Sequence, residues 1–574
     1  MFFFNISDLK TKLSWGRFLV QGLELRIYFS DGSIWVDKAE IQEGNEKMKQ
    51  DTSEVMKDSE AFQVRLIGRG VIVGIVGGLI VLAYRIALTY ASAWLNEVIG
   101  WAEGNGLRMG LWFLCLTAMA VIIGKLVTYE PMISGSGIPQ LEGEMAGKLE
   151  QTWWKVIPAK FLGGFLSLLG GLSLGREGPS IQLGAMSGKG IARVLQCGRT
   201  EEKFLMTCGA SAGLSAAFHA PLAGVMFSLE EVHKNFSAAV LVSAMASSLT
   251  ADLIAGSVIG IEPVFQFDIG NVLPHSYYWL LIPLGMILGA MGVFYNWFTL
   301  MMQKLYQKLK KIPVWGKLLI PLAAAWILAF TMPELLGSGH NLIIGLTSHQ
   351  YTLGALLFLF LLKFLFAGLS FGSGAPGGIF FPLLVLGSLI GGIFGMTGVS
   401  FFGMDLDYVN NFVLLSMAGY FTAIVRAPLT GIILIFEMTG SLSQLLSLSI
   451  ISIIAYVTAS LLKSAPIYES LLERLLQKRG VEPEEDERGK ILQEQVIMLG
   501  SELENRRIRE ITWPKHCLLV AVKRGERELL PHGDTLLKAS DMIVILTNEK
   551  NEAEVHDYLE QLCREKLHSE GERG

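Results

Sequence analysis

The stretch "APLAGVMFSLEE" at residues 220–231 returns, with similar residues, as "APLTGIILIFEM" at residues 427–438. In both copies a glutamate stands nine positions after the proline, at Glu230 and Glu437. An Ala-Gly pair precedes each copy, and a loop rich in glycine and proline lies further upstream in both. We interpret this part of the chain as two homologous halves.

The composition indicates a membrane protein. Hydrophobic residues make up 51% of the 574 residues and charged residues only 17%, against about 25% charged residues in a soluble protein. Apolar stretches of about 20 residues, long enough to cross a bilayer, recur between residues 66 and 463. The net charge of -5, without a basic stripe, argues against a nucleic-acid partner. Five widely spaced cysteines support neither a disulfide framework nor a metal site.

Basic residues predict how the halves are oriented. Arg65 and Arg69 precede or begin the first spanning helix, predicted at residues 64–94, and place that end in the cytoplasm. A second basic cluster at residues 302–317 follows the apolar run of residues 277–302, which therefore ends inside. The halves are thus predicted to be inverted, so that paired broken helices meet near the bilayer midplane. Both chain termini are expected in the cytoplasm.

Four loops are predicted to be helix entrances. Proline costs little in the first turn, because the N–H groups there have no partner within the helix. These N–H groups and the positive end of the helix dipole favour a bound anion. Without a full positive charge, such a site suits a monovalent anion that must bind and then leave. The loops are "GSGIPQ" (135–140), "GREGPS" (175–180), "GSGAPGGIFFP" (372–382) and "SAPIYES" (464–470).

The second loop carries two adjacent charges in an apolar region, Arg176 and Glu177. An ionised carboxylate at a helix entrance competes with the anion, and a protonated one withdraws. Glu177 is therefore predicted to be both gate and proton acceptor, since carboxylates inside a membrane are usually functional. The alternative is a capping glutamate that stabilises the helix dipole. Arg176 either draws anions toward the entrance or pairs with a nearby carboxylate.

The loops resemble the signature loops of the CLC family of chloride channels and proton/chloride antiporters. The resemblance rests on "GSGIP", "GREGP", "GSGAPGGIFFP" and a later "APIYE", in the family's order, and it covers about residues 65–475. It implies an all-α polytopic membrane protein with two inverted-topology repeats and broken helices, in which Glu177 is the gating glutamate. It further implies that a central chloride ion is bound by the hydroxyl groups of Ser136 and Tyr468 and the backbone N–H groups of Ile379 and Phe380.

The resemblance also implies an inner proton relay at Glu231, the second residue of an "EE" pair. Glu231 favours an exchanger, because channel-type members usually carry a different residue there; the alternative is ordinary interfacial charge at a helix end. Lys160 matches a basic position that raises the potential near the ion path, or it is a helix-end anchor. Ser136, where the family also uses proline, indicates chloride rather than nitrate.

Residues 491–565 are predicted to form a small cytoplasmic α/β domain. Its stretches "CLLVAVKRGERELLP" and "DMIVILTN" indicate strands, and "NEAEVHDYLEQLC" indicates a helix. The segment resembles the RCK C-terminal (TrkA-C) domain, so it either binds a small-molecule ligand or acts as a dimer clamp. The other predicted limits are a cytoplasmic tail at 1–63, a transmembrane domain at 64–475 with halves at about 64–262 and 275–468, a charged linker at 476–490 and a tail at 566–574.

Together these features predict a homodimeric secondary active transporter in the lipid bilayer of the cell membrane. It would exchange chloride for protons, with one anion pathway per subunit and no cofactor. The alternative is a passive chloride channel of the same fold, gated by voltage or pH. A third hypothesis is a ligand sensor, which intact transport after deletion of residues 481–574 would contradict. An enzyme is not indicated, since the sequence lacks a nucleophile elbow, a Walker A motif and an HExxH motif.

Overall fold

The structure is a computed structural model with two compact units, Met1–Leu472 and Glu473–Gly574. Side chains are described from Phe62 onward. The described residues are 16–20, 23–30, 33–36, 38–234, 236–260, 265, 272–348, 351–440, 442–480, 490–514, 517–525, 527–548 and 551–564. The predicted tail at 566–574 and most of the predicted linker therefore lie outside the described residues.

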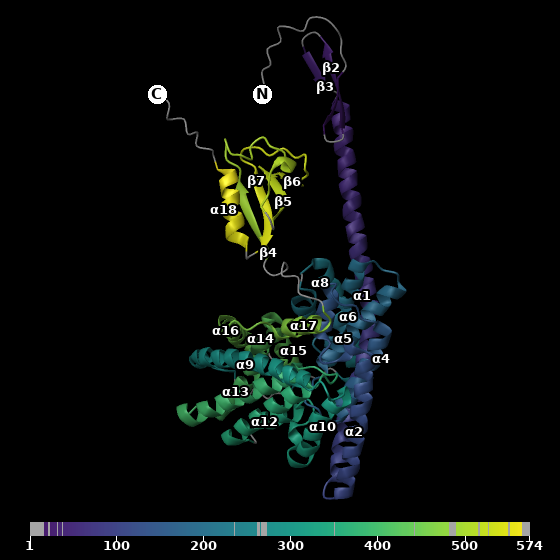
Figure 1. Ribbon diagram of the computed structural model, residues 1–574, viewed down its shortest axis with the longest axis vertical. Coiled ribbons are helices and arrows are strands. Elements are labelled where there is room, and N and C mark those ends of the chain that lie inside the picture. The colour runs from purple at the N-terminus through teal and green to yellow at the C-terminus, as the bar shows by residue number, and fades with distance from the viewer. Residues whose placement is uncertain are drawn as a thin grey trace. The chain divides into compact units, whose positions relative to one another are not determined.

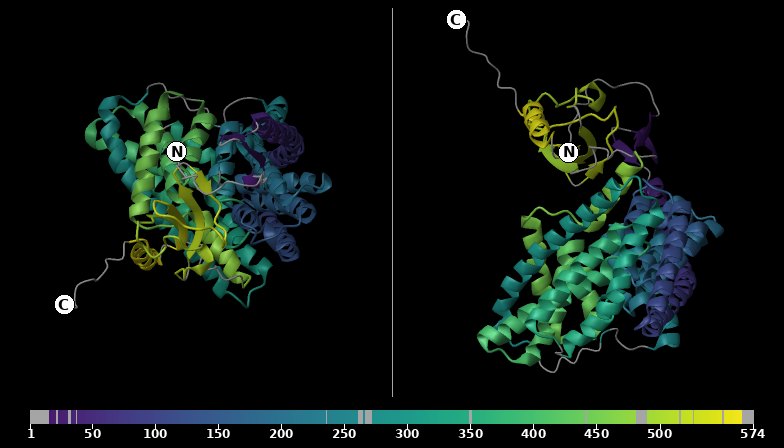
Figure 2. Two further views of the ribbon diagram at one scale, coloured as in Figure 1. Left: turned by 90° about the horizontal axis from the view of Figure 1, so that it is seen from above. Right: turned by 60° about the horizontal axis from the view of Figure 1, so that its bottom comes forward.

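The first unit is mostly helical, as predicted (Figures 1 and 2). Among the described residues, eight helical segments are long and apolar enough to cross a membrane. The helices are α1 (Lys38–Ala102), α2 (Gly106–Tyr129), α3 (Ile138–Met145), α4 (Trp153–Leu169), α5 (Glu177–Val194), α6 (Arg199–Phe218), α7 (Pro221–Phe227), α8 (Ala238–Ile259), α9 (Leu281–Lys308), α10 (Val314–Thr331), α11 (His340–Thr347), α12 (Leu353–Gly372), α13 (Phe380–Phe402), α14 (Val409–Val425), α15 (Pro428–Thr439), α16 (Leu445–Leu461) and α17 (Ile467–Lys478).

The first span is longer than predicted. The apolar segment of α1 runs from Phe62 to Ala102 rather than over residues 64–94, because residues after 94 favour a helix until Gly104, whose φ of 73° ends it. The helix also begins earlier, at Lys38. The region predicted as a tail therefore contains part of α1 and an antiparallel sheet of β1 (Gly16–Val20), β2 (Leu23–Ser30) and β3 (Ser33–Val36).

The two repeated "APL" segments cap each other. Glu437, near the end of α15, accepts two backbone N–H groups in the first turn of α7, at 2.9 and 2.7 Å. Glu230, just after α7, accepts two in the first turn of α15, at 3.4 and 2.9 Å. Each carboxylate thus satisfies N–H groups that have no partner within their own helix. The reciprocal contacts require α7 and α15 to run antiparallel, as two inverted halves would place them.

We expect Glu437→Gln to destabilise the membrane unit by about 1 kcal/mol. The amide keeps one acceptor oxygen but loses the second acceptor and the charge that complements the dipole of α7. Thermal unfolding of the full chain in detergent measures the loss. Glu97→Gln, which changes an exposed carboxylate on α1, is the matched control. Equal unfolding temperatures for Glu437→Gln and Glu97→Gln would contradict the capping role of Glu437.

The second unit is the predicted small α/β domain. Its strands are β4 (Lys490–Val496), β5 (Cys517–Arg524), β6 (Arg527–Leu529) and β7 (Met542–Asn548), which form an antiparallel sheet in the order β4-β7-β5-β6. Helix α18 (Glu552–Cys563) packs its apolar side chains into one core with those of the sheet. Figure 1 shows α18 in yellow beside the strands.

An ion pair with a buried aspartate stabilises this domain. The Arg524 guanidinium donates to both carboxylate oxygens of Asp541, at 2.8 and 2.7 Å, and the N–H of Lys538 adds a third bond at 2.8 Å. Burial of Asp541 would by itself raise the pKa of its carboxyl group. The three hydrogen bonds outweigh burial and hold that pKa below its usual value.

Candidate functional site

Three of the four predicted helix entrances meet through backbone hydrogen bonds. Gly175 and Gly378 exchange two bonds, at 2.7 and 2.8 Å, and the N–H of Gly377 donates to Gly135 at 3.0 Å. These glycines directly precede or lie close to the first turns of α5, α13 and α3. The contacts therefore bring the positive ends of three helices from both halves to one place, an arrangement that favours a bound anion.

Ser136 lies buried at this meeting point. Its side chain belongs to the loop before α3, its residue is 2% exposed, and Oγ has no hydrogen-bond partner among the described residues. It packs against Gly178 so closely that a Cβ at 178 would lie 2.3 Å from Oγ. A buried hydroxyl without a partner costs free energy unless a ligand uses it. The geometry therefore leaves the Ser136 hydroxyl available to an anion.

Three further predicted chloride ligands lie in the same buried region. Ile379 is the N-cap of α13 and Phe380 its first residue, 1% and 0% exposed; their N–H groups belong to the part of a helix that lacks intrahelical acceptors. Tyr468, in the first turn of α17, is fully buried, and its hydroxyl has no partner among the described residues. The Tyr468 hydroxyl also lies within electrostatic range of both Glu177 and Glu231.

Glu177 is the first residue of α5 and is fully buried. Its carboxylate turns back toward Gly175. If residue 175 carried a Cβ, that atom would lie 2.1 Å from one carboxylate oxygen of Glu177. The backbone nitrogen of Phe381 lies 3.0 Å from the same position. Both carboxylate oxygens lack a full hydrogen bond to any described residue. The carboxylate thus lies at the joined helix entrances, where the backbone N–H groups of Phe381 and of Glu177 itself approach it.

Arg176 is the N-cap of α5 and makes no ion pair with a described residue. Its guanidinium lies over the ring of Phe218, 5.9 Å from the centroid, and lines a cavity that Glu177 also lines. The guanidinium also interacts electrostatically with the adjacent Glu177 carboxylate, so its position is compatible with both predicted roles.

Lys160 holds the serine loop in place. The buried ammonium group donates to the carbonyl oxygens of Ile133, at 2.9 Å, and Gly135, at 2.7 Å. These bonds turn two carbonyl oxygens toward the lysine. The structure therefore gives Lys160 a structural partner on the Ser136 loop, in addition to any effect of its charge on the ion path.

Glu231 lies in a short π-helix, Ser228–His233, that follows α7. It is 5% exposed, and Oε1 has no hydrogen-bond partner among the described residues. Its carboxyl group faces that of Glu142 on α3, and Lys234 lies 3.9 Å from Glu142. Glu230, by contrast, is committed to capping α15. Glu142 was not predicted from the sequence; the available signal was the first of two carboxylates in the helix that follows "GSGIP".

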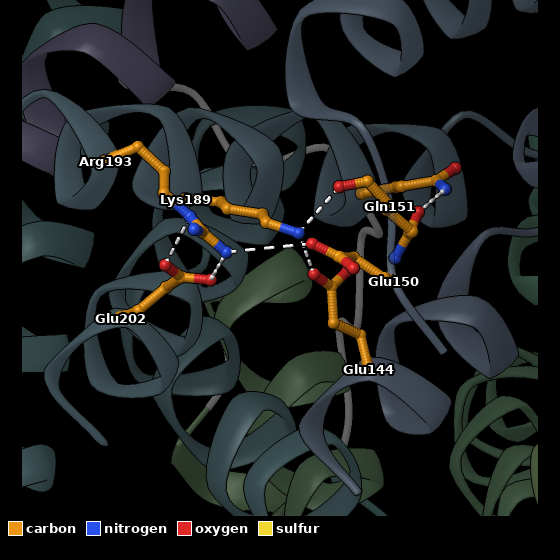
Figure 3. A network of polar contacts seen from close by, with 7 residues as sticks. Glu144, Glu150, Gln151, Lys189, Arg193 and Glu202 are labelled. Carbon is orange, nitrogen blue, oxygen red and sulfur yellow. Dashed lines mark hydrogen bonds and ion pairs between the residues drawn. The ribbon is translucent and has the colours of Figure 1, made fainter. Parts of the chain in front are cut away.

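A buried polar network holds α5 against α3 and neighbouring loops (Figure 3). Lys189 of α5 forms an ion pair with Glu144 of α3 and donates to the carbonyl oxygen of Gln151 at 2.6 Å. Gln182, which lies in α5 a little more than one turn after Glu177, donates to the side-chain oxygen of Gln151 at 2.7 Å. The network fixes the helix whose first residue is the candidate gate. These side chains were not predicted from the sequence.

The comparisons with known proteins agree with this geometry. Residues 118–460 match the family described as Voltage gated chloride channel, and residues 492–560 match the TrkA-C domain. The chain is 34% identical over 445 residues to the H(+)/Cl(-) exchange transporter ClcA of Vibrio cholerae serotype O1 (strain M66-2), which covers 75% of this chain and 93% of that protein. The chain belongs to the voltage gated chloride channel, or CLC, family.

Other CLC proteins show the same relationship. The ClcA transporter of Citrobacter koseri is 35% identical over 426 residues, covering 72% of this chain and 89% of the relative. The crystal structure of a slow cyanobacterial Cl-/H+ antiporter superposes with a TM-score of 0.69 at 30% identity and covers 72% of this chain and 99% of that one. A CLC-type fluoride/proton antiporter, at 23% identity and a TM-score of 0.59, supports the fold alone. The predicted CLC fold and TrkA-C domain are confirmed.

Proposed function

We propose that this protein is a secondary active transporter that exchanges chloride for protons across the cell membrane. The observation that carries the proposal is the buried carboxylate of Glu177 at the joined helix entrances, near the hydroxyl of Ser136, which has no hydrogen-bond partner among the described residues. The similarity to the H(+)/Cl(-) exchange transporters ClcA and to the cyanobacterial Cl-/H+ antiporter supports it.

In the proposed cycle, chloride and the ionised carboxylate of Glu177 compete for one site at the helix entrances. A chloride ion binds to the hydroxyl groups of Ser136 and Tyr468 and to the N–H groups of Ile379 and Phe380. When ionised, the carboxylate of Glu177 competes for the same positive helix ends, because anions are favoured there. When protonated, it loses its charge and withdraws. Each passage of chloride is thereby linked to the protonation of Glu177.

The proposed inner proton route begins at Glu231. Two adjacent buried carboxyl groups cannot both be ionised at low cost, so the pair of Glu231 and Glu142 holds a proton readily. Tyr468 lies within electrostatic range of both ends of the route. Glu231 is therefore proposed to pass protons from the cytoplasm toward Glu177. In the proposed assembly two copies form a homodimer, each with its own pathway, and both termini lie in the cytoplasm.

Proton movement in liposomes under a chloride gradient tests the proposal. We expect the wild-type protein to pump protons uphill, and Glu231→Gln to lose proton movement while chloride flux persists. Glu230→Gln is the matched control, because its carboxylate is the neighbour in sequence but caps α15; it should keep proton movement. Chloride flux without proton movement in the wild type would instead establish a passive channel.

A further inference from the structure

A basic segment joins α9 to α10, and the proposed transport cycle does not use it. Residues 304–317 contain five lysines, whereas the longer stretch 269–333 contains no aspartate or glutamate. The positive charge of the segment is therefore not offset within its own part of the chain. Four of the lysines are exposed and the last is half-buried; they are Lys304, Lys308, Lys310, Lys311 and Lys317.

Neighbouring elements do not offset this charge either. None of the five lysine side chains forms an ion pair with a described residue. Helix α2 adds a sixth, exposed lysine, Lys125. Its neighbour Gly124 packs against the start of α10, where a Cβ at 124 would lie 2.8 Å from Cβ of Trp315. The carboxylate at the end of α2, that of Glu130, is buried and accepts the N–H of Met132 at 3.2 Å.

The helices beside this segment face the bilayer. An apolar 18-residue window in α2 and one in α10 are each 28% buried, the lowest values among the eight candidate spans. The two helices pack along each other (Figure 1). Because α1 is predicted to begin in the cytoplasm, α2 runs back toward it, and the end of α2 meets the start of α10. The basic segment is therefore expected at the inner surface of the membrane.

Exposed apolar side chains accompany the lysines. Leu305 is 51% exposed, Trp315 43%, and Ile312 and Val314 36% each. Tryptophan favours the boundary between acyl chains and headgroups, and a soluble anion would leave these apolar side chains in water. A lipid joins a phosphate group to acyl chains in one molecule. The combination of lysines and apolar side chains therefore fits an anionic lipid better than a soluble anion.

The same segment is connected to the third helix entrance. Tyr306, which lies between two of the lysines, is buried, and its hydroxyl group donates to the carbonyl oxygen of Leu369 in α12 at 3.1 Å. Its ring lies against Gly372, where a Cβ would approach a ring atom to 3.0 Å. Gly372 begins the loop that leads to Ile379, the N-cap of α13. Whatever holds the end of α9 in place therefore also supports this loop.

We propose that the segment at 304–317 binds the headgroups of anionic phospholipids in the inner leaflet. The lysines contact the phosphate group, while Trp315 and the exposed aliphatic side chains contact the upper acyl chains. Basic clusters next to a spanning helix are a typical site for such lipids. The bound lipid steadies the end of α9 and, through Tyr306, the loop before α13. Lipid binding can be measured without transport, so the proposal does not depend on the proposed function.

Native mass spectrometry of the full-length protein in detergent tests the site with phosphatidylglycerol, which is anionic, and phosphatidylcholine, which is not. The wild type should bind phosphatidylglycerol more tightly. The triple variant Lys308→Gln, Lys310→Gln, Lys311→Gln should bind it about 10- to 100-fold more weakly, because each lysine near the headgroups contributes about fivefold. These side chains are exposed, so the fold should not change. Arginine at the same three positions keeps the charge and is the matched control, which should bind as the wild type does.

Two results of this measurement would overturn the proposal. One is equal binding of phosphatidylglycerol by the wild type and the triple glutamine variant. The other is displacement of the lipid by inorganic phosphate, which would show a site for a soluble anion instead of a lipid.

Chloride flux in liposomes tests the connection to α13. Flux through the wild type and the triple arginine variant should be higher when phosphatidylglycerol replaces a third of the phosphatidylcholine, whereas flux through the triple glutamine variant should be the same in both vesicles. Lost lipid binding with unchanged flux would overturn the connection through Tyr306. Absence of chloride flux in every vesicle would count against the proposed function, while the binding measurement would still decide the lipid site.

Discussion

Glu177→Ala is expected to conduct chloride without moving protons. The substitution removes the carboxylate that is proposed to compete with chloride at the entrances of α5 and α13. It also removes the group that would take up the proton, because no other carboxyl group replaces Glu177 at the first turn of α5. Proton movement should fall by about 100-fold or more, the typical contribution of a positioned acid or base, while chloride flux continues.

The measurement compares chloride and proton fluxes in the same liposome preparation. Glu177→Gln separates shape from charge, since the amide keeps the volume of the side chain but cannot ionise. It should also lose proton movement, but with slower chloride flux, because a side chain still occupies the entrance. Glu97→Gln, which changes an exposed carboxylate on α1, is the control for loss of a carboxylate elsewhere in the membrane unit. Proton pumping that survives in Glu177→Ala would rule out Glu177 as the proton acceptor.

The sequence predicts the helix entrances well because their chemistry is local. Glycine and proline determine where a helix begins, and they do so within a few residues. The quoted loops before α3, α5 and α13 could therefore be recognised from their residues alone. The repeat of the "APL" segments predicts two halves for the same reason. It also marked Glu230 and Glu437 as equivalent residues without indicating what they bind.

Contacts between distant segments could not be predicted in this way. Glu142 and Glu231 are separated by 89 positions in the sequence, and only the packing of α3 on the turn after α7 brings them together. The reciprocal caps likewise depend on an antiparallel crossing of α7 and α15. Lys160 could be matched to a position of the family, but its two carbonyl partners follow from the fold of the loop.

Gly178→Ala is expected to weaken chloride binding about 10- to 100-fold while leaving the fold intact. A Cβ at 178 would lie 2.3 Å from Oγ of Ser136 and 2.7 Å from its carbonyl oxygen. Rotation of the Ser136 side chain relieves only the contact with Oγ. The contact with the carbonyl oxygen remains, so the backbone of the serine loop must shift. Overpacking of this kind costs about 1 to 3 kcal/mol, and here the cost falls on the loop that is proposed to hold the ion.

The fold should survive because alanine suits the helix. Gly178 lies in the first turn of α5 without a positive φ angle, and alanine favours a helix over glycine by about 1 kcal/mol. Chloride titration by calorimetry, with thermal unfolding in parallel, separates binding from stability. Gly190→Ala is the matched control in α5, where the three heavy atoms nearest to the new Cβ belong to the ring of Trp153, the nearest at 3.0 Å. Equal chloride affinity in the two variants would show that the Ser136 loop does not position the anion.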